Sequence, residues 1–298
     1  MNTVTNKSTA APKKEKSRSL ERAKEIWRLF RKNKAAVAGL IVLTIIILVA
    51  VFADQIADPE LITKISRDRQ QGPSAEHWFG TDNLGRDLFA RVVHAAPTSL
   101  TIGLLVAIAS LLIGGAIGLS CAYFGGKFDN IVMRIVDVLS AVPGTLLSMV
   151  VVCVLGAGMR NLIIAMIIGR FRAVVRMARS AALGVCGREY VEAAKAGGSG
   201  DLRLILRHIA PNIMGTLIVS TTMGVSASII SACSLSFIGL GVQPPTPEWG
   251  YMLNEARPYM STCPHLMLIP GLAIVITSLS INMVGDGLRD ALDPRLKT

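Results

Sequence analysis

Residues 189–211 read EYVEAAKAGGSGDLRLILRHIAP, a polar and basic stretch that lies between two long apolar segments. A loop that only joined two membrane spans could be much shorter. Its length and its internal pattern therefore indicate a structured element with a task of its own at a membrane surface.

The pattern within this stretch predicts two short helices joined by a glycine elbow. Residues 190–196 are rich in helix formers, and the three glycines within residues 197–200 are expected to stop that helix. Asp201 can cap a second helix over residues 202–209. Pro211 is expected to break the chain before the next apolar run. The two helices would form a docking element.

The composition places this element in a membrane protein. The chain has 298 residues, of which 51% are hydrophobic, and its mean hydropathy is +0.51. Such a chain is too apolar for an ordinary soluble domain and is typical of a polytopic membrane protein. The net charge of +11 would suggest nucleic acid in a soluble protein. Here most of the positive charge flanks apolar runs, so membrane orientation explains it better and no nucleic-acid partner is expected.

Six membrane spans are predicted from the apolar runs, which makes the fold class an all-α integral membrane protein. They cover residues 35–53, 98–124, 130–155, 161–179, 213–238 and 266–285. With both termini inside, 24 of the 31 Lys and Arg residues fall on or near the inner side, as orientation by positive charge requires. We therefore expect a multi-pass protein of the bacterial cytoplasmic membrane.

The predicted organisation has three parts. Residues 1–34 form a basic cytoplasmic tail with an amphipathic helix over residues 20–30, for which an anchoring and a regulatory role are equally open. Residues 35–94 contain the first span and an external loop. Residues 95–298 form the core, with a cytoplasmic coupling loop over residues 180–211.

Within the coupling loop, the spacing of Glu192-Ala193-Ala194, Gly198 and Pro211 resembles the EAA loop of ABC importer permeases. His208 is ordinary in the peptide branch of that family, whereas Ala210 stands where Leu is usual. The resemblance implies that the loop sits in a groove of a cytoplasmic ATPase, with Glu192 contacting an arginine there. The candidate ATPase-coupling residues are Glu189, Tyr190, Glu192, Ala193, Ala194, Gly198, Asp201, Arg203 and Pro211.

Three further motifs resemble the C-type permease subunit of dipeptide, oligopeptide and nickel importers. They are HWFGTDNLGRD at residues 77–87, LSFIGLGVQPPTPEWG at residues 235–250 and GDGLRDALDP at residues 285–294. The first motif could also be a metal-binding or catalytic loop, but one His and scattered Asp residues are weak evidence for either. In the second, Pro244, Pro245, Pro247 and Trp249 are candidate contacts for a substrate-binding protein, although Trp249 could equally be an interfacial anchor.

The resemblance implies a type I importer fold of the MetI-like kind and a role as half of the translocation pathway for peptides. The implied partners are a homologous second permease, two ABC ATPases, an external binding protein and membrane lipid. The chain has no GxxxxGK[ST] phosphate-binding loop. We therefore expect no enzyme activity and no cofactor or metal on this chain, with ATP and magnesium held by the partner ATPases.

Candidate pathway residues lie in the fourth and fifth predicted spans. Arg170 and Arg172 are deep in the fourth, where arginines face a cavity, a partner or an anion; a pathway role and pairing with a partner subunit are equally open. Ser228 and Ser231 belong to a hydroxylated face that could line a polar path or bond to neighbouring helices. Asp137 and Pro143 interrupt the third predicted span. An acid within a span is a functional candidate, but for Asp137 we favour a structural pairing with Arg134 one helical turn away.

Other functions fit the sequence less well. A proton-driven transporter needs buried acids along its path, and Asp137 is the only acid placed within a span. A membrane enzyme needs a nucleophile and base or a metal cluster, and the predicted spans contain no histidine. A channel that works without an ATPase remains an alternative function.

The sequence leaves the solute undefined among dipeptides, oligopeptides, glutathione, nickel and other small solutes. The five cysteines are expected to be packing residues.

Overall fold

A computed structural model describes residues 15–292, and the described part of the chain is helical with no named strand. The helices are α1 (Glu15–Phe30), α2 (Lys34–Val51), α3 (Ala53–Ile56), η1 (Pro59–Ile62), α4 (Leu88–Phe124), α5 (Gly126–Ser140), α6 (Gly144–Leu155), α7 (Met159–Cys186), α8 (Glu189–Ala196), α9 (Asp201–Leu204), η2 (Ile205–Ile209), α10 (Ala210–Phe237), α11 (Trp249–Ala256), η3 (Arg257–Tyr259) and α12 (His265–Leu292).

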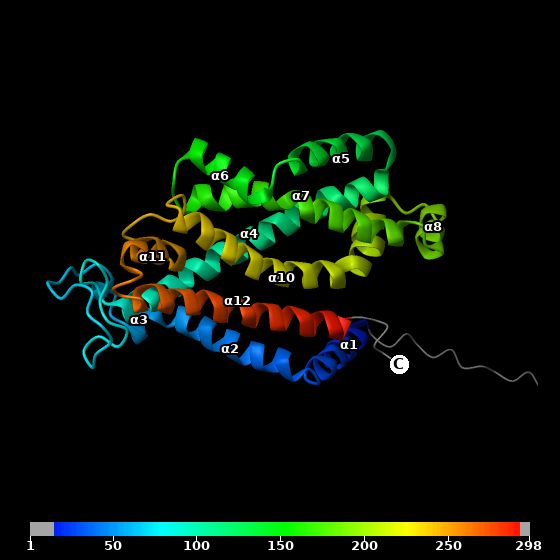
Figure 1. Ribbon diagram of the computed structural model, residues 1–298. Coiled ribbons are helices and arrows are strands. Elements are labelled where there is room, and N and C mark those ends of the chain that lie inside the picture. The colour runs from blue at the N-terminus through cyan, green and yellow to red at the C-terminus, as the bar shows by residue number, and fades with distance from the viewer. Residues whose placement is uncertain (1–14, 293–298) are drawn as a thin grey trace, which may run out of the picture.

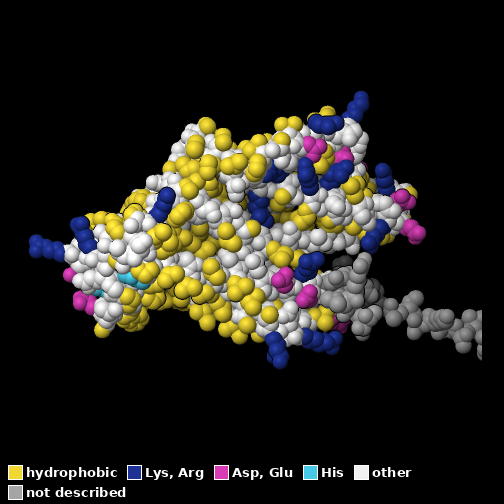
Figure 2. Space-filling model, viewed as in Figure 1, with side chains coloured by type: hydrophobic (Ala, Val, Ile, Leu, Met, Phe, Trp, Pro, Cys, Tyr) yellow, Lys and Arg dark blue, Asp and Glu magenta, His cyan; other side chains and the backbone are white. Residues whose placement is uncertain are grey.

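The long helices run between two ends of the molecule (Figure 1). The loop before α4 lies at one end with α3 and α11, and α8 lies at the other end with α1. Apolar side chains cover the surface between these ends, where the view shows few charges (Figure 2). This banded surface is what a lipid bilayer selects, because charged groups avoid the hydrocarbon region.

Each of the six predicted spans coincides with helical structure. By length and hydropathy, four helices among the described residues can cross a membrane: α2, α4, the continuous helix of residues 201–237, and α12. The pair α5 and α6 qualifies as a fifth, bent, span. Helix α7 has 28 residues and packs along α4, but its arginines keep it out of the apolar set.

The third predicted span is not a straight helix. Helices α5 and α6 meet at an angle of 84°, so the span predicted over residues 130–155 is interrupted at Pro143. Pro143 lacks an N–H and has extended backbone (φ −54°, ψ 140°), and a residue in that conformation ends one helix before the next begins. The two segments form either a broken span or a re-entrant loop.

The predicted pairing of Asp137 with Arg134 is wrong. The Asp137 carboxylate accepts a hydrogen bond from Arg176 on α7 at 2.7 Å. Asp129, at the start of α5, accepts two hydrogen bonds from Arg179. Charge-assisted pairs between α5 and α7 thus replace the local pairing within α5.

The second span begins ten residues earlier than predicted, at Leu88 instead of residue 98. The Asp87 side chain caps α4 by accepting a hydrogen bond from the Ala90 N–H at 2.8 Å. Arg91 and His94 lie in this first part of the helix and are buried. Because these side chains are polar, a prediction from apolar runs places the start of the helix too late.

Pro211 does not break the chain, contrary to the prediction. The preceding turn, η2, is a π-helix, and the Ala210 N–H bonds to the Ile205 carbonyl five residues back. A turn of this width tolerates the following proline, which has no N–H to donate to the helix. The docking element therefore continues without interruption into α10.

Helix α1 packs against the end of α12. Phe30 is buried beside Ala36, Val284 and Ala291, while Trp27 is half exposed and stacks on Phe30. The predicted amphipathic helix thus contacts the protein core through its last turn. The side chains of residues 1–20, 22 and 23 lie outside the described part.

Glycines allow α4 and α7 to approach closely. A Cβ at Gly118 would lie 2.5 Å from the Val175 carbonyl oxygen and 2.8 Å from the Ala178 Cβ. Small residues at such positions let helix backbones pack tightly within a membrane.

We expect Gly118→Val to push these helices apart and lower stability by about 1–3 kcal/mol, because the obstacle is backbone that cannot move aside. Thermal unfolding in detergent measures the effect. Gly184→Val on α7 is the matched control, since nothing lies within 4 Å of a Cβ there. Equal loss of thermal stability in the two variants would show that the close approach is not required.

Candidate functional site

The glycine elbow predicted between the two short helices is present. Helix α8 ends at Ala196, and Gly198 adopts φ +80°, a left-handed conformation that glycine adopts without strain. The Ser199 N–H then bonds to the Ala194 carbonyl at 3.1 Å, which closes the helix end as in a Schellman motif. The chain turns at this point into α9.

Most of the candidate coupling residues in this element are exposed to solvent, and buried apolar residues anchor the element to the protein core. Val191, Leu204 and Ile209 are buried, and Val191 and Ile209 belong to a core that also contains residues of α4, α7 and α10. The exposed candidates are Glu189, Tyr190, Glu192, Ala193, Gly198, Asp201, Arg203 and Pro211, whereas Ala194 is partly buried. Leu202 and Leu206 add large exposed apolar side chains. The element is therefore held rigidly and carries both a charge and an apolar surface for a partner.

Asp201 does not cap the second helix as predicted. No side-chain cap is present at the start of α9, where Gly200 holds the N-cap position. The Asp201 carboxylate instead accepts a hydrogen bond from the Tyr123 hydroxyl at 2.6 Å. This bond joins the elbow to the end of α4, a membrane span.

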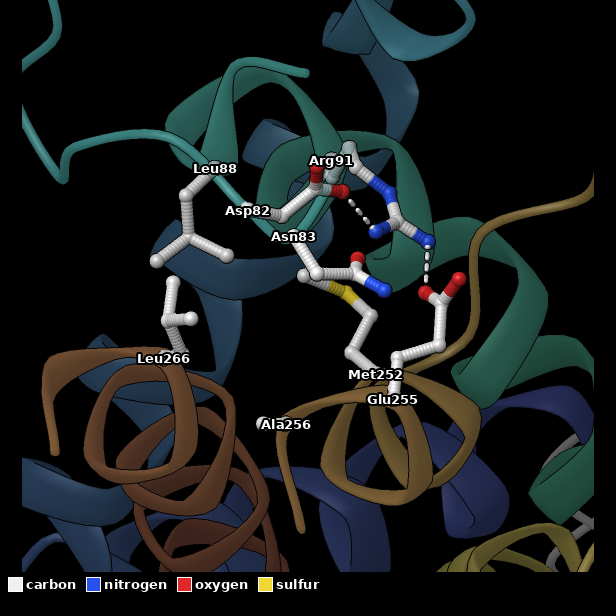
Figure 3. A pocket seen from close by; sticks show the side chains of 8 residues that line it. All are labelled: Asp82, Asn83, Leu88, Arg91, Met252, Glu255, Ala256 and Leu266. Atoms are coloured by element: carbon white, nitrogen blue, oxygen red, sulfur yellow. Dashed lines mark hydrogen bonds and ion pairs between the residues drawn. The ribbon is translucent and has the colours of Figure 1, made fainter. Parts of the chain in front are cut away.

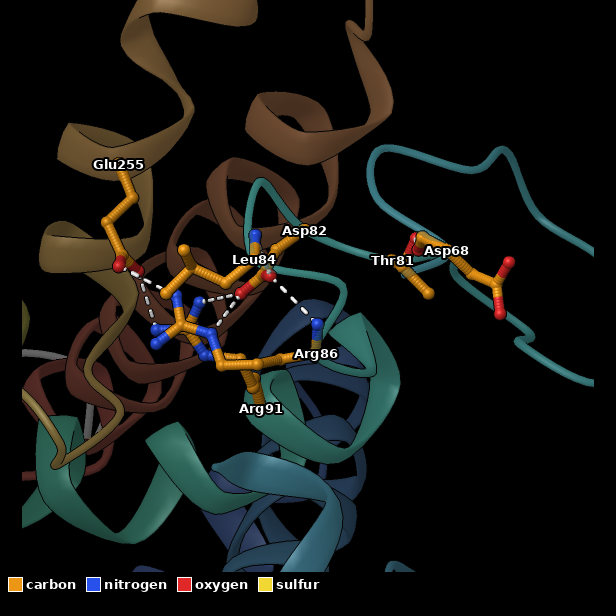
Figure 4. A network of polar contacts seen from close by, with 7 residues as sticks. All are labelled: Asp68, Thr81, Asp82, Leu84, Arg86, Arg91 and Glu255. Atoms are coloured by element: carbon orange, nitrogen blue, oxygen red, sulfur yellow. Dashed lines mark hydrogen bonds and ion pairs between the residues drawn. The ribbon is translucent and has the colours of Figure 1, made fainter. Parts of the chain in front are cut away.

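At the opposite end of the molecule, four charged side chains form a closed network (Figure 4). Asp82 accepts hydrogen bonds from Arg86 at 2.6 Å and from Arg91. Glu255 on α11 accepts one from each of the same arginines, at 2.7 and 2.6 Å. Two positive and two negative charges thus balance, which buried ions require. The network joins the external-loop motif, α4 and α11.

Glu255 carries no local sequence signal, because the arginines that it pairs with lie more than 160 residues away. Beside it lies a cavity of about 10 Å³ that Asp82, Asn83 and Met252 help to line (Figure 3), roughly the space one water needs. Burial alone would lower the pKa of Arg86, but the hydrogen bond that it donates to Glu255 and the charge of Asp82 raise it. Burial and the Glu255 charge raise the pKa of the Tyr251 hydroxyl.

His77, the first residue of the same motif, has a structural role. Its Nδ1 lies 2.7 Å from the carboxylate of Asp87, and Asp87 caps α4. Across residues 15–292, no group of three or more His, Cys, Asp or Glu side chains is placed to hold a metal ion. The motif therefore fixes the loop against the helix.

The proline-rich segment before α11 divides into exposed and buried parts. Pro244 and Pro245 are exposed and joined by a cis peptide bond, while Pro247 is buried. Trp249 is only 2% exposed, and its Nε1 donates a hydrogen bond to the Val92 carbonyl at 3.1 Å. Trp249 is thus neither an accessible contact nor an interfacial anchor. Of the four candidate contacts, only Pro244 and Pro245 can meet a partner directly.

Buried Glu248 precedes Trp249 and was not singled out from the sequence. Its side chain is fully buried and accepts hydrogen bonds from the N–H groups of Gly250 and Tyr251, at 2.9 and 2.8 Å. It caps the first turn of α11, where a negative charge also complements the helix dipole. The Cys233 thiol lies 3.3 Å from the same carboxylate.

Three of the four candidate pathway residues line one cavity. Arg170 on α7 and Ser228 and Ser231 on α10 border a space of about 310 Å³ together with residues of α4 and α6. Arg172 does not line it. Its guanidinium donates to the carbonyls of Leu139 and Val142 and so supports the bend between α5 and α6.

The geometry defines a class: a polytopic helical membrane protein with a rigid helical elbow at one end and a polar cavity among its helices. Residues 114–298 match the family model described as binding-protein-dependent transport system inner membrane component. Residues 22–73 match the N-terminal TM domain of oligopeptide transport permease C. The chain belongs to this family of ABC transporter permeases.

Named relatives extend the match to almost the whole chain. The glutathione transport system permease protein GsiD of Escherichia coli strain 536 is 46% identical over 274 residues, which cover 92% of this chain and 90% of the relative. The dipeptide transport system permease protein DppC of Alkalihalophilus pseudofirmus is 41% identical over 275 residues, with the same coverage.

A solved structure of the MetNI methionine ABC transporter, described as inward facing, shares the fold. The TM-score is 0.56 at 17% identity, over 69% of this chain and 98% of that one. The predicted MetI-like fold is therefore confirmed.

Proposed function

We propose that this chain is one of two permease subunits of an ATP-driven importer of small peptides. The observation that carries the proposal is the near full-length identity to permeases of glutathione and dipeptide transport systems. Glutathione and dipeptides are both short, anionic or zwitterionic peptides. The solute of this transporter belongs to the same chemical class.

The partners follow from the same assignment. A homologous second permease completes the pathway, two ABC ATPases bind ATP and magnesium, and an external binding protein delivers the solute. Helix α8 and the elbow dock on an ATPase, with both termini on that cytoplasmic side. Support comes from the exposed charge and apolar side chains of this rigid element and from the positive charge that flanks the spans there.

The elbow can transmit movement because it is joined firmly to the spans. Helix α9 continues through the π-turn into α10, and Tyr123 joins Asp201 to α4. When ATP brings the ATPases together, a shift of α8 moves these helices as a lever and switches the pathway between outward and inward opening. At the other end, Pro244 and Pro245 are available to contact the binding protein.

The test is uptake by proteoliposomes that contain the complete transporter, with and without this subunit. We expect ATP-dependent uptake of labelled dipeptide or glutathione that requires the subunit. Uptake of Ni²⁺ without peptide uptake would indicate the alternative solute class. Uptake that persists with a hydrolysis-deficient ATPase would instead indicate a channel or a secondary transporter.

A further inference from the structure

Arg170 is a partly buried cation without a partner among the described residues. Of the four arginines on α7 between residues 170 and 179, Arg172 donates to two backbone carbonyls, and Arg176 and Arg179 pair with Asp137 and Asp129. No hydrogen bond or ion pair joins Arg170 to any residue in the described part of the chain, and its Nε is buried and unsatisfied.

The position of Arg170 makes this isolation costly. At 1.5 Å per residue it lies about 17 Å from the first residue of α7 and about 24 Å from the last, near the middle of the helix. A guanidinium at that depth without a counter-charge is unfavourable, and such residues in membrane proteins are typically paired or face a polar path. The missing counter-charge must come from outside the described chain.

The surrounding residues leave space for that guanidinium and open it to the cavity. A Cβ at Gly224 would lie 1.8 Å from Arg170 Nη2, so α10 accommodates the guanidinium only because residue 224 is glycine. The cavity of about 310 Å³ continues from Arg170 past Thr145 and Ser231. No hydrogen bond engages the Thr145 or Ser231 hydroxyl within residues 15–292, so both are available to polar groups of a solute.

From this geometry we propose that Arg170 binds the carboxylate of the peptide as it passes through the cavity, and that Gly224 positions the guanidinium for this contact. The inference rests on the proposed function, because it assumes a peptide solute. A guanidinium matches a carboxylate with two parallel hydrogen bonds, and such charge-assisted pairs are stronger than neutral ones. Arg170 is thereby a specificity-determining residue.

The test compares uptake of one tripeptide with uptake of its C-terminal amide, in proteoliposomes with the complete transporter and its binding protein. The binding protein is the same for every variant, so its own preference cancels when acid-to-amide ratios are compared between variants. We expect Arg170→Gln to lower this ratio about tenfold to a hundredfold, as loss of a charged hydrogen-bonded contact does. Arg170→Lys should retain part of the preference.

Two further variants separate binding from structure. Gly224→Ala keeps the charge but displaces the guanidinium, so it should lower the ratio in the same direction, whereas Gly271→Ala should not, since nothing lies within 4 Å of a Cβ there. Arg160→Gln, which removes an exposed positive charge from the first turn of the same helix, should leave the ratio unchanged.

An unchanged ratio in Arg170→Gln would overturn the inference while the wild type still imports peptide. The inference would equally be overturned if Arg170→Gln lowered the yield of assembled transporter without changing the ratio, because Arg170 would then pair with an acid of the second permease. Failure of the wild type to take up either peptide would contradict the proposed function instead.

Discussion

Reversal of the charge at Glu192 is expected to reduce ATP-driven uptake at least tenfold and to remove the coupling of ATP hydrolysis to substrate delivery. Glu192 is exposed in the first turn of α8. The Glu192→Lys change costs the helix about 0.5 kcal/mol through the helix dipole, so the chain still folds. At an interface with an ATPase arginine, however, a like charge costs several kcal/mol. Uptake and ATPase rates of the reconstituted transporter measure the effect.

Glu60→Lys is the matched control for this variant. Glu60 is also exposed but lies in η1, in the segment at the opposite end of the molecule from α8 (Figure 1). The control should transport normally. Normal uptake and normal ATPase stimulation by Glu192→Lys would remove Glu192 from the coupling contact.

The second large effect is expected at the charge network on the other side of the protein. Glu255→Gln leaves Arg86 and Arg91 with only Asp82 for two positive charges. The side chains of these three residues are at most 8% exposed, so an uncompensated charge there should cost about 3–5 kcal/mol. We expect a marked fall in the thermal unfolding temperature of the detergent-solubilised protein.

A second substitution distinguishes charge balance from loss of packing. Arg86→Gln combined with Glu255→Gln restores the charge balance, so the double variant should be more stable than the sum of the single effects predicts. Glu76→Gln, an exposed site in the same loop, should change little. Additive losses in the double variant would show that charge balance does not hold the network together.

Local patterns in the sequence predicted the helices and the elbow well, because glycine and helix formers act within a few residues. They failed where distant groups override the local signal. Pro143 does interrupt the third span, with a bend of 84°, whereas Pro211 lies in a continuous helix because a π-turn precedes it. A proline alone does not reveal whether the preceding carbonyls can adapt.

The side-chain networks were the least predictable part of the site. Asp137 was expected to pair within its own helix, but Arg176 on α7 lies closer to its carboxylate. Glu255 gave no local signal, because its arginine partners lie more than 160 residues away. Glu248 was missed although its role is local, as the cap that accepts from the Gly250 and Tyr251 N–H groups. Trp249 was expected at the surface and is core. In contrast, Arg170, Ser228 and Ser231 were each marked by polarity within an apolar run, and the structure brings them to one cavity.

The central claim is that the elbow after α8 meets an ATPase on the cytoplasmic side. Labelling of a Glu192→Cys variant, with the five native cysteines replaced, by a membrane-impermeant thiol reagent tests it most directly. The account predicts labelling in inverted membrane vesicles stripped of ATPase, protection when the ATPases are rebound, and no labelling in right-side-out vesicles. Labelling in right-side-out vesicles, or labelling that bound ATPase does not diminish, would contradict the account.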